Sequence, residues 1–103
     1  MEIKFHKKAI EEIKRLSNHE REEIKKKIDS RQKRQNNILK QRGVGISYDR
    51  HGDAIHYFKA ETSEDEYRVF FDIKDKAITL LGIRPRDDDT YLNLREYTKR
   101  SDR

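Results

Sequence analysis

The spacing of hydrophobic residues near the start of the chain predicts a strand followed by a helix. In residues 1–6, Ile3 and Phe5 alternate with polar residues, and this two-residue period is typical of a strand with one buried face. The period then lengthens, and Ile10 and Ile13 fall on one side of a helix whose other side is charged. We therefore expect a short strand that leads directly into an amphipathic helix.

A second helix is predicted to follow the first after a short break. Ser17 and Glu20 have the spacing of a capping box, in which a hydroxyl and a carboxylate bind free backbone amides at a helix start. Ile24 and Ile28 continue the apolar face, which fades in the mid-thirties. Residues 7–37 are therefore predicted to form a helical hairpin.

Three strand-like segments occupy the second half of the chain. Residues 54–60, 66–73 and 77–83 are rich in aromatic and β-branched residues, and short polar turns separate them. Such turns favour an antiparallel meander over residues 54–84. Two glycines precede these strands, and residues 46–53 are predicted to be a loop or an irregular hairpin.

This order of elements predicts an α+β fold class, in which the N-terminal strand and helical hairpin pack on one face of a small antiparallel sheet. The length suits a single domain over residues 1–103, with residues 92–103 as a short C-terminal tail that begins as a helix. Tyr67 and Val69 are predicted to face the helices. By alternation Arg68 then projects from the other face, which we expect to be uncovered.

Composition limits the core and points to a polyanionic partner. Only 32% of the residues are hydrophobic and 44% are charged, so the periodic segments must supply the core. Residues 1–42 hold 14 Lys and Arg against 7 Asp and Glu, whereas residues 43–103 hold 11 against 13. A basic half joined to a mixed half favours nucleic acid as partner; lysine-coated, solvated helices are the alternative explanation.

Several classes of protein are disfavoured by what the sequence lacks. No apolar run approaches the length of a membrane span, and the opening MEIKFHKK has no apolar stretch typical of a secretion signal. There is no cysteine, which excludes disulfides and thiolate metal sites. We therefore expect a cytoplasmic protein with no membrane partner.

Three arginines in the strand-rich half are candidates for binding an anion. Arg68 interrupts an apolar strand, and Arg84 and Arg86 lie two apart where the last strand ends. Side chains two apart on a strand point to a common side, so the three are predicted to gather on the open sheet face. A guanidinium fork binds two phosphate oxygens at once, which suits a phosphodiester. The alternative for Arg68 is a structural pair with Asp72 or a glutamate.

These features together resemble the RelE/ParE superfamily of bacterial toxins, and most closely its RelE-like branch. The resemblance rests on the strand order, the YRVFF run, the apolar strand that ends GIRPR, the tyrosine beyond it and the opening KFHKKAIEEIKRL. It implies a RelE-like, microbial ribonuclease-type fold and a cognate antitoxin as partner. In the RelE branch it also implies cleavage of mRNA on the ribosome without a cofactor.

The resemblance carries over to individual residues. Arg68 and Arg84 match arginines that hold the scissile phosphate, and Arg86 matches a further arginine that contacts RNA. Tyr91 matches a tyrosine that stacks on a base or assists acid–base chemistry. The RelE branch carries two lysines in the second strand, whereas this chain has Lys59, which we take as the catalytic counterpart.

The sequence leaves the general base open. Metal-free cleavage uses the ribose 2′-hydroxyl as nucleophile and needs a group to take its proton, and His56 and Glu61 are candidates besides Lys59. Neighbouring residues of a strand point to opposite faces, so Lys59 and His56 cannot both line one cleft without a bulge. We prefer Lys59 and keep His56 as an RNA-binding candidate. Lys26 and Lys33 are expected to touch RNA phosphates, or only to keep their helix solvated.

Other functions remain as alternatives. ParE-type relatives share the fold but act by binding and poisoning DNA gyrase, and a catalytically degenerate binding protein is a third possibility. The helical hairpin argues against a double-stranded RNA-binding module. Asp87, Asp88 and Asp89 are expected to be a solvated turn rather than a metal site, because no other cluster has the spacing to complete one.

Overall fold

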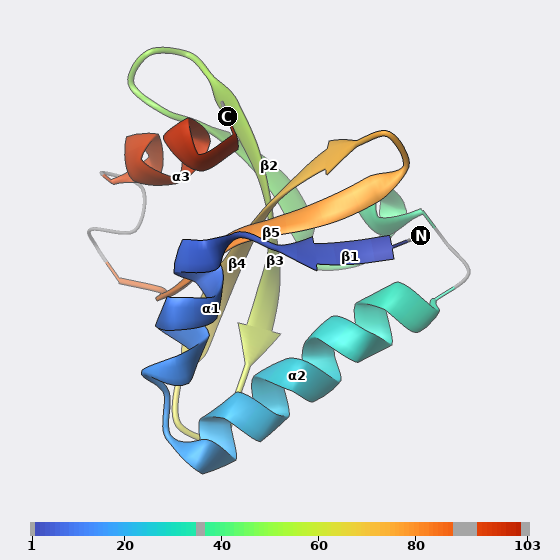
Figure 1. Cartoon of the computed structure of the whole chain (residues 1–103), viewed down its shortest axis with the longest axis vertical. Helices are drawn as coiled ribbons and strands as arrows, with labels where there is room; N and C mark the ends of the chain where they lie inside the picture. Colours follow the sequence, from blue (N-terminus) through green and yellow to red (C-terminus); the bar gives the residue numbers. More distant parts are fainter. Residues whose placement is uncertain (1, 35–36, 88–92, 102–103) are drawn as a thin grey trace.

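The computed structural model describes residues 2–34, 37–87 and 93–101. Within these ranges the chain forms three α-helices and one five-stranded sheet (Figure 1). The helices are α1 (Lys7–Lys14), α2 (Asn18–Lys33) and α3 (Leu94–Ser101), with a 3₁₀ turn η1 (Ile38–Lys40) after α2. The strands are β1 (Glu2–Phe5), β2 (Val44–Tyr48), β3 (Ala54–Glu61), β4 (Glu66–Lys74) and β5 (Ala77–Pro85). No helix in the described part of the chain is long and apolar enough to cross a membrane.

The strands lie in the order β1-β5-β4-β3-β2 and confirm the predicted α+β class. β3, β4 and β5 form the antiparallel meander that the polar turns predicted. β1, however, lies parallel to β5, with Ile3 opposite Ile78, so the sheet is mixed rather than antiparallel throughout. Hairpin neighbours pair antiparallel, whereas a strand separated from its partner by most of the chain can pair in either direction.

β2 corrects the prediction of a loop or irregular hairpin over residues 46–53. It pairs antiparallel with β3, with Gly45 opposite Tyr57. The Tyr57 ring lies across Gly45, where an added Cβ would come within 2.6 Å of the tyrosine hydroxyl. The glycine therefore permits close packing, but a glycine inside a strand also weakens the pattern from which strands are predicted.

α1 and α2 cover one face of the sheet, as the helical periodicity predicted (Figure 1). Ile24 and Ile28 of α2 are buried in one cluster with Phe58, Val69 and Phe71 of β3 and β4. Burying a side chain of this size contributes roughly 1.5–3 kcal/mol. This cluster is the larger part of the core and fixes α2 against the centre of the sheet.

The start of α2 shows one half of the predicted capping box. Ser17 Oγ accepts a hydrogen bond from the Glu20 backbone N–H at 3.2 Å. The Glu20 carboxylate is buried and accepts hydrogen bonds from the Tyr67 hydroxyl and, at 3.4 Å, from Thr62 Oγ1. Burial and the bond to Glu20 raise the pKa of Tyr67. Glu20 thus ties the start of α2 to the β3–β4 hairpin.

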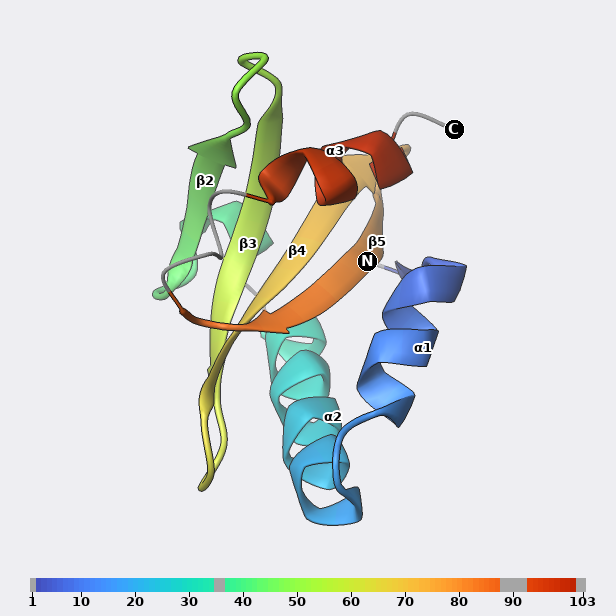
Figure 2. The same ribbon diagram turned by 90° about the vertical axis from the view of Figure 1, so that its left-hand side faces the viewer.

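α3 packs on the sheet face that we expected to be uncovered, so that expectation is wrong (Figure 2). Leu94 and Tyr97 are buried against Phe70 of β4 and Leu81 of β5, and the rings of Phe70 and Tyr97 stack at 4.5 Å. Gly82 permits this approach, since an added Cβ would lie 2.4 Å from the Tyr97 ring. A strand that is apolar on both faces must be buried on both. Here α3 buries the second face, although half of its residues are charged.

A polar cluster fixes α3 to the β2–β3 hairpin. Asp49 Oδ1 accepts hydrogen bonds from the backbone N–H groups of His51 at 2.8 Å and Asp53 at 3.0 Å. Its Oδ2 accepts from Thr98 Oγ1 at 2.7 Å and from Arg95 Nη1 at 3.2 Å. These bonds, with that of Thr98 foremost, hold the pKa of Asp49 well below its usual range.

Candidate functional site

Three cationic residues lie in a row across the three central strands. Lys59 of β3 is opposite Arg68 of β4, and Arg68 is opposite Arg84 of β5. Residues in direct register on strands about 4.8 Å apart point to the same side of a sheet. We call Lys59, Arg68 and Arg84 the cationic row. It lies on the α3 side of the sheet, because its neighbours Phe58 and Val69 face α2.

Arg68 is buried, and the expectation that it reaches open solvent is wrong. Only 2% of the residue is exposed. Its Cζ lies 5.3 Å from the centroid of the Tyr57 ring, and its Nη1 is 3.6 Å from Glu66 Oε1. Because β4 lies between β3 and β5, the aliphatic part of the Arg68 side chain packs against residues of both neighbouring strands. The glutamate pair that we considered as the alternative is therefore present.

Arg84 and Arg86 retain solvent access on the same side. Arg84 is half-buried; burial and the charge of Glu12 raise the pKa of the Tyr97 hydroxyl, and the nearby Arg84 partly offsets the rise. The Arg86 side chain is 57% exposed, and its Nη1 lies 3.4 Å from Glu66 Oε2. Glu66 is thus shared by Arg68 and Arg86. The three arginines gather on one side as predicted, but two of them are accessible.

Lys59 is exposed at the edge of β3, on the same face as the arginines. β2 begins opposite Phe58, so the last residues of β3 lie beyond the end of the neighbouring strand. Glu61, two residues on, is exposed on the same face. His56 lies on the opposite face, where its ring stacks on Phe71 at 5.5 Å. The structure therefore separates His56 from the cationic row and leaves Lys59 and Glu61 beside it.

Several predicted residues fall outside the described part of the chain. Tyr91 is one of them, and so are Asp88 and Asp89. Asp87 is described and exposed. Within residues 2–34, 37–87 and 93–101, no three His, Asp or Glu side chains come together as metal ligands.

Tyr57 is a site residue that the sequence did not reveal. Its ring lies beneath the Arg68 guanidinium and meets Phe70 edge-on at 6.5 Å. A cation held over an aromatic face is stabilised by roughly 0.5–2 kcal/mol, so Tyr57 helps to fix the charge of the row in place. Tyr57 lies two residues before Lys59 in β3, so strand alternation places both side chains on the same face. This alternation was the evidence in the sequence for its position.

Lys26 and Lys33 lie elsewhere, on the outer face of α2. Both are exposed, and they border a shallow depression of about 500 Å³ together with Asp29, Ser30 and Arg34. They are on the opposite side of the sheet from the cationic row, because α2 covers the other face. Their predicted contact with RNA phosphates stays a prediction.

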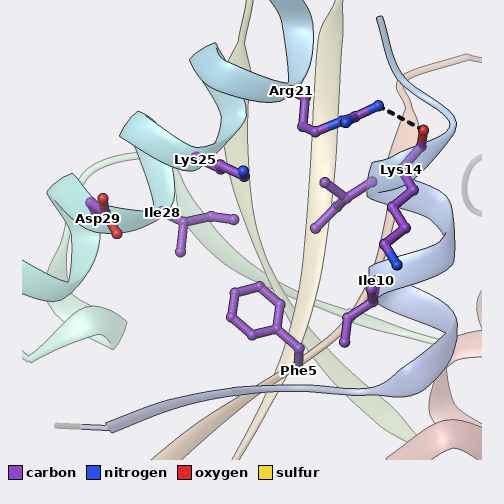
Figure 3. Close-up of a pocket in the computed structure, with 8 residues that line it drawn as sticks. Phe5, Ile10, Lys14, Arg21, Lys25, Ile28 and Asp29 are labelled. Atoms are coloured by element: carbon purple, nitrogen blue, oxygen red, sulfur yellow. Dashed lines mark hydrogen bonds between the residues drawn. The ribbon is translucent and has the colours of Figure 1, made fainter. Parts of the chain in front are cut away.

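A separate apolar groove lies between α1, α2 and β1 (Figure 3). It has a volume of about 410 Å³, and Phe5, Ile10 and Ile28 point into it. Phe5 is 44% exposed and Ile10 is 40% exposed, which is unusual for large apolar side chains that lie together. Lys14 and Lys25 stand on its rim.

The charges around the cationic row favour an anionic ligand. At the row itself, four cations (Lys59, Arg68, Arg84 and Arg86) lie with two carboxylates (Glu61 and Glu66). Asp72, on the same face of β4, lies four residues further along the strand. The outer members of the row stand on strands about 10 Å apart, with Arg68 buried between them. A phosphate bound between Lys59 and Arg84 would therefore meet direct contacts at its sides and, beneath it, the Arg68 guanidinium that pairs with Glu66.

Comparisons with known proteins give one informative match. No protein-family model and no curated protein sequence matches the chain. Among solved structures, the chain is similar to the E. coli toxin RelE in the free state, as a variant with two arginines replaced by alanine. The TM-score is 0.60 at 19% sequence identity, and the match covers 96% of this chain and 95% of that one. The chain therefore has the fold of the RelE toxin.

Proposed function

We propose that this protein is the toxin of a type II toxin–antitoxin system and cleaves mRNA on the ribosome. The observation that carries the proposal is the register of Lys59, Arg68 and Arg84, which places three cations in a row on one sheet face. The likeness to RelE supports it. In that structure the two substituted arginines are two positions apart, which is also the spacing of Arg84 and Arg86.

The proposed reaction is transfer of the phosphodiester to the neighbouring 2′-hydroxyl. The 2′-oxygen bonds to phosphorus as its proton leaves, and the bond to the 5′-oxygen breaks as that oxygen gains a proton. Lys59 and Arg84 contact the phosphate, where preorganised charge of this kind is worth ~10²–10³ in rate per donor. Glu61 takes the proton of the 2′-hydroxyl, the charged Lys59 supplies a proton to the leaving 5′-oxygen, and Arg68 positions the row from below. Tyr91 keeps its proposed role in stacking on a base.

A reconstituted translation reaction with one defined mRNA tests this proposal. We expect the purified protein to cut the message within the translated frame, and only when ribosomes are present. The fragments should end in a 2′,3′-cyclic phosphate and a 5′-hydroxyl, since the 2′-oxygen is the nucleophile. If the protein arrests translation but leaves the message intact, the ribonuclease proposal is ruled out.

The burial of Arg68 supports a second candidate, a ParE-like protein that binds and inhibits DNA gyrase without catalysis. An arginine that pairs with Glu66 and packs on Tyr57 serves a folded binding surface as well as it serves a phosphate. In this case the protein should block DNA supercoiling by purified gyrase and leave mRNA intact. The same preparation assayed both ways separates the two functions.

We further propose that the antitoxin of this system binds the apolar groove. Phe5 and Ile10 expose apolar surface there, and three cations (Lys14, Arg21 and Lys25) line the groove against one carboxylate, Asp29. This combination suits a helix with an apolar face flanked by acidic residues. Such a segment would bury the exposed side chains and pair with the rim lysines.

A further inference from the structure

A second basic surface lies where the end of α2 meets the last residues of β3. It is a hollow of about 350 Å³, which we call the basic hollow. Its cations come from three separate segments of the chain: Lys27, Arg31, Arg34, Arg42 and Lys59. Glu61 is the carboxylate that lines it. Among the described residues, none of the five cations forms a salt bridge, so their charge is uncompensated by any ion pair.

Arg31 holds the hollow in shape. Its Nη1 donates hydrogen bonds to the Arg42 carbonyl at 2.6 Å and to Gln41 Oε1 at 3.4 Å. Its Nη2 donates to the Lys59 carbonyl at 3.4 Å, and its Cζ lies 5.1 Å from the centroid of the Phe58 ring. One guanidinium thus fixes both backbone segments that carry Arg42 and Lys59. A ligand therefore meets backbone segments that are already held together.

The surroundings of Arg31 disfavour its charged form. Arg31 is half-buried, and its burial, followed by the nearby charge of Arg34, lowers its pKa. Its guanidinium donates to carbonyl and amide oxygens of Gln41, Arg42 and Lys59. A bound anion would offset the charge of Arg34 and favour the charged form of Arg31, in line with the geometry of the hollow.

The lining distinguishes a nucleic-acid backbone from an acidic peptide. None of the described lining residues has an aliphatic or aromatic side chain, because they are cations, a serine, a glycine and a glutamate. Protein partners anchor themselves through apolar and aromatic pockets, which this hollow does not offer and the apolar groove does. A phosphodiester backbone needs cations alone, and Arg34 and Arg42 supply them at the rim.

Lys59 connects the hollow to the cationic row. It belongs to both: it is in register with Arg68, and its side chain lines the hollow where β3 passes the start of β2, with its backbone N–H donating to the Gly43 carbonyl at 2.9 Å. A single strand that crosses the row therefore meets the hollow as it leaves on the β3 side. We propose that the basic hollow binds backbone phosphates of the RNA strand beyond Lys59; this deepens the proposed function, on which its choice of RNA rests.

Binding of an RNA that cannot be cleaved tests the inference separately from catalysis. The probe is a fluorescein-labelled single strand of about 10 nucleotides with every ribose 2′-O-methylated, followed by anisotropy between about 50 and 200 mM KCl. The test variant is Arg34→Gln with Arg42→Gln, whose side chains are exposed, and Arg31 is left intact. The matched control is Lys7→Gln with Lys8→Gln on α1, which removes the same charge from exposed positions outside the hollow.

We expect the test variant to bind at least about tenfold more weakly than the wild type at low salt. Its slope of log affinity against log salt should be shallower by about 1.4, since each lost phosphate contact on a single strand accounts for ~0.7. The control should match the wild type. Equal affinity and slope in test and control variants, or no binding by the wild type, would overturn the inference, as would equally tight binding of a poly-glutamate peptide.

The outcome is independent of the cleavage assay. If the variant loses RNA affinity but the wild type cuts no message, the hollow stands and the ribonuclease proposal fails. If the wild type cuts message and the variant binds and cuts as well as the control, the ribonuclease stands and the hollow fails.

Discussion

At the scale of single residues, the neighbours of each arginine decide what its charge can do. Arg68 lies between the Tyr57 ring and Glu66 and is closed off from solvent, so it serves the fold as well as the local potential. Arg84 and Arg86 are accessible on the same side and can meet a phosphate directly. Alternation in the sequence predicted the shared face of all three. It gave no information about what covers each one, because cover comes from residues distant in the chain.

Arg68→Ala should therefore lose stability, whereas Arg86→Ala should not. Removing the buried Arg68 side chain leaves a cavity beside the Tyr57 ring, while Glu66 keeps its pair with Arg86, and we expect a loss of about 2–4 kcal/mol in the free energy of unfolding. Arg86 is mostly exposed, and its substitution should change that free energy by less than about 1 kcal/mol. Urea unfolding followed by circular dichroism measures both. Equal unfolding midpoints for the two variants would contradict the buried position of Arg68.

The β4–β5 turn offers a substitution that should stabilise the protein. Asp75 and Lys76 have φ of 52° and 65°, as in a two-residue type I′ turn, and the sequence predicted a tight turn here. A left-handed conformation costs a residue with a side chain about 1–2 kcal/mol. Lys76→Gly should therefore raise the melting temperature. Lys76→Ala, which keeps the strain, should leave the melting temperature unchanged; a rise of equal size in both variants would exclude relief of backbone strain as the cause.

At the scale of elements, periodicity predicted the helices and strands that carry a regular apolar face. α1, α2, β3, β4 and β5 each carry a regular apolar pattern, and all five appear near their predicted positions. β2 contains a glycine that packs on Tyr57, and this weakens its strand pattern. A helix at the start of the C-terminal tail was predicted, but half of α3 is charged, and its packing on the sheet was not foreseen. Both are held by contacts with distant residues, as Asp49 holds Thr98. Such contacts are not visible in local spacing, and they decide which sheet face is covered.

The Asp49 cluster makes the attachment of α3 dependent on pH. The pKa of Asp49 is lower in the folded protein than the value of about 3.9 in an unfolded chain, so its stabilisation is present above that value. It is lost as pH falls towards the folded pKa. We expect the free energy of unfolding to decrease below about pH 4 in the wild type. Asp49→Asn should be less stable at neutral pH and show a flatter profile; parallel profiles for the two proteins would show that Asp49 is not the titrating group.

The apolar groove gives a matched test of antitoxin binding. Ile10 is 40% exposed within the groove, and Leu39 is 45% exposed in η1, outside it. Ile10→Glu should weaken capture of the antitoxin at least about tenfold, because it places a charge where an apolar helix face would pack. Leu39→Glu makes the same chemical change and should have no effect. Co-purification with the protein encoded beside this one measures both, and undiminished capture by the Ile10 variant would remove the groove from the interface.

At the scale of the whole molecule, the proposed surfaces lie on different sides of one sheet. The cationic row is on the α3 side, whereas the apolar groove lies between α1 and α2 (Figures 1 and 2). A partner seated in the groove alone would leave Lys59 and Arg84 uncovered. To cover the row as well, the proposed antitoxin would need a second segment that passes around the sheet edge. The excess of positive charge in residues 1–42 remains available to RNA on the α2 side.

The central claim is that Lys59 and Arg84 act on one phosphate from opposite sides of Arg68. Single-turnover cleavage rates of ribosome-bound mRNA by the wild type, Lys59→Ala, Arg84→Ala and the double variant test it most directly. We expect each single variant to lose ~10²–10³ in rate and the double variant to lose clearly less than the product of the two, because the residues share one transition state. Undiminished cleavage by either single variant, with the fold intact by circular dichroism, would contradict the account.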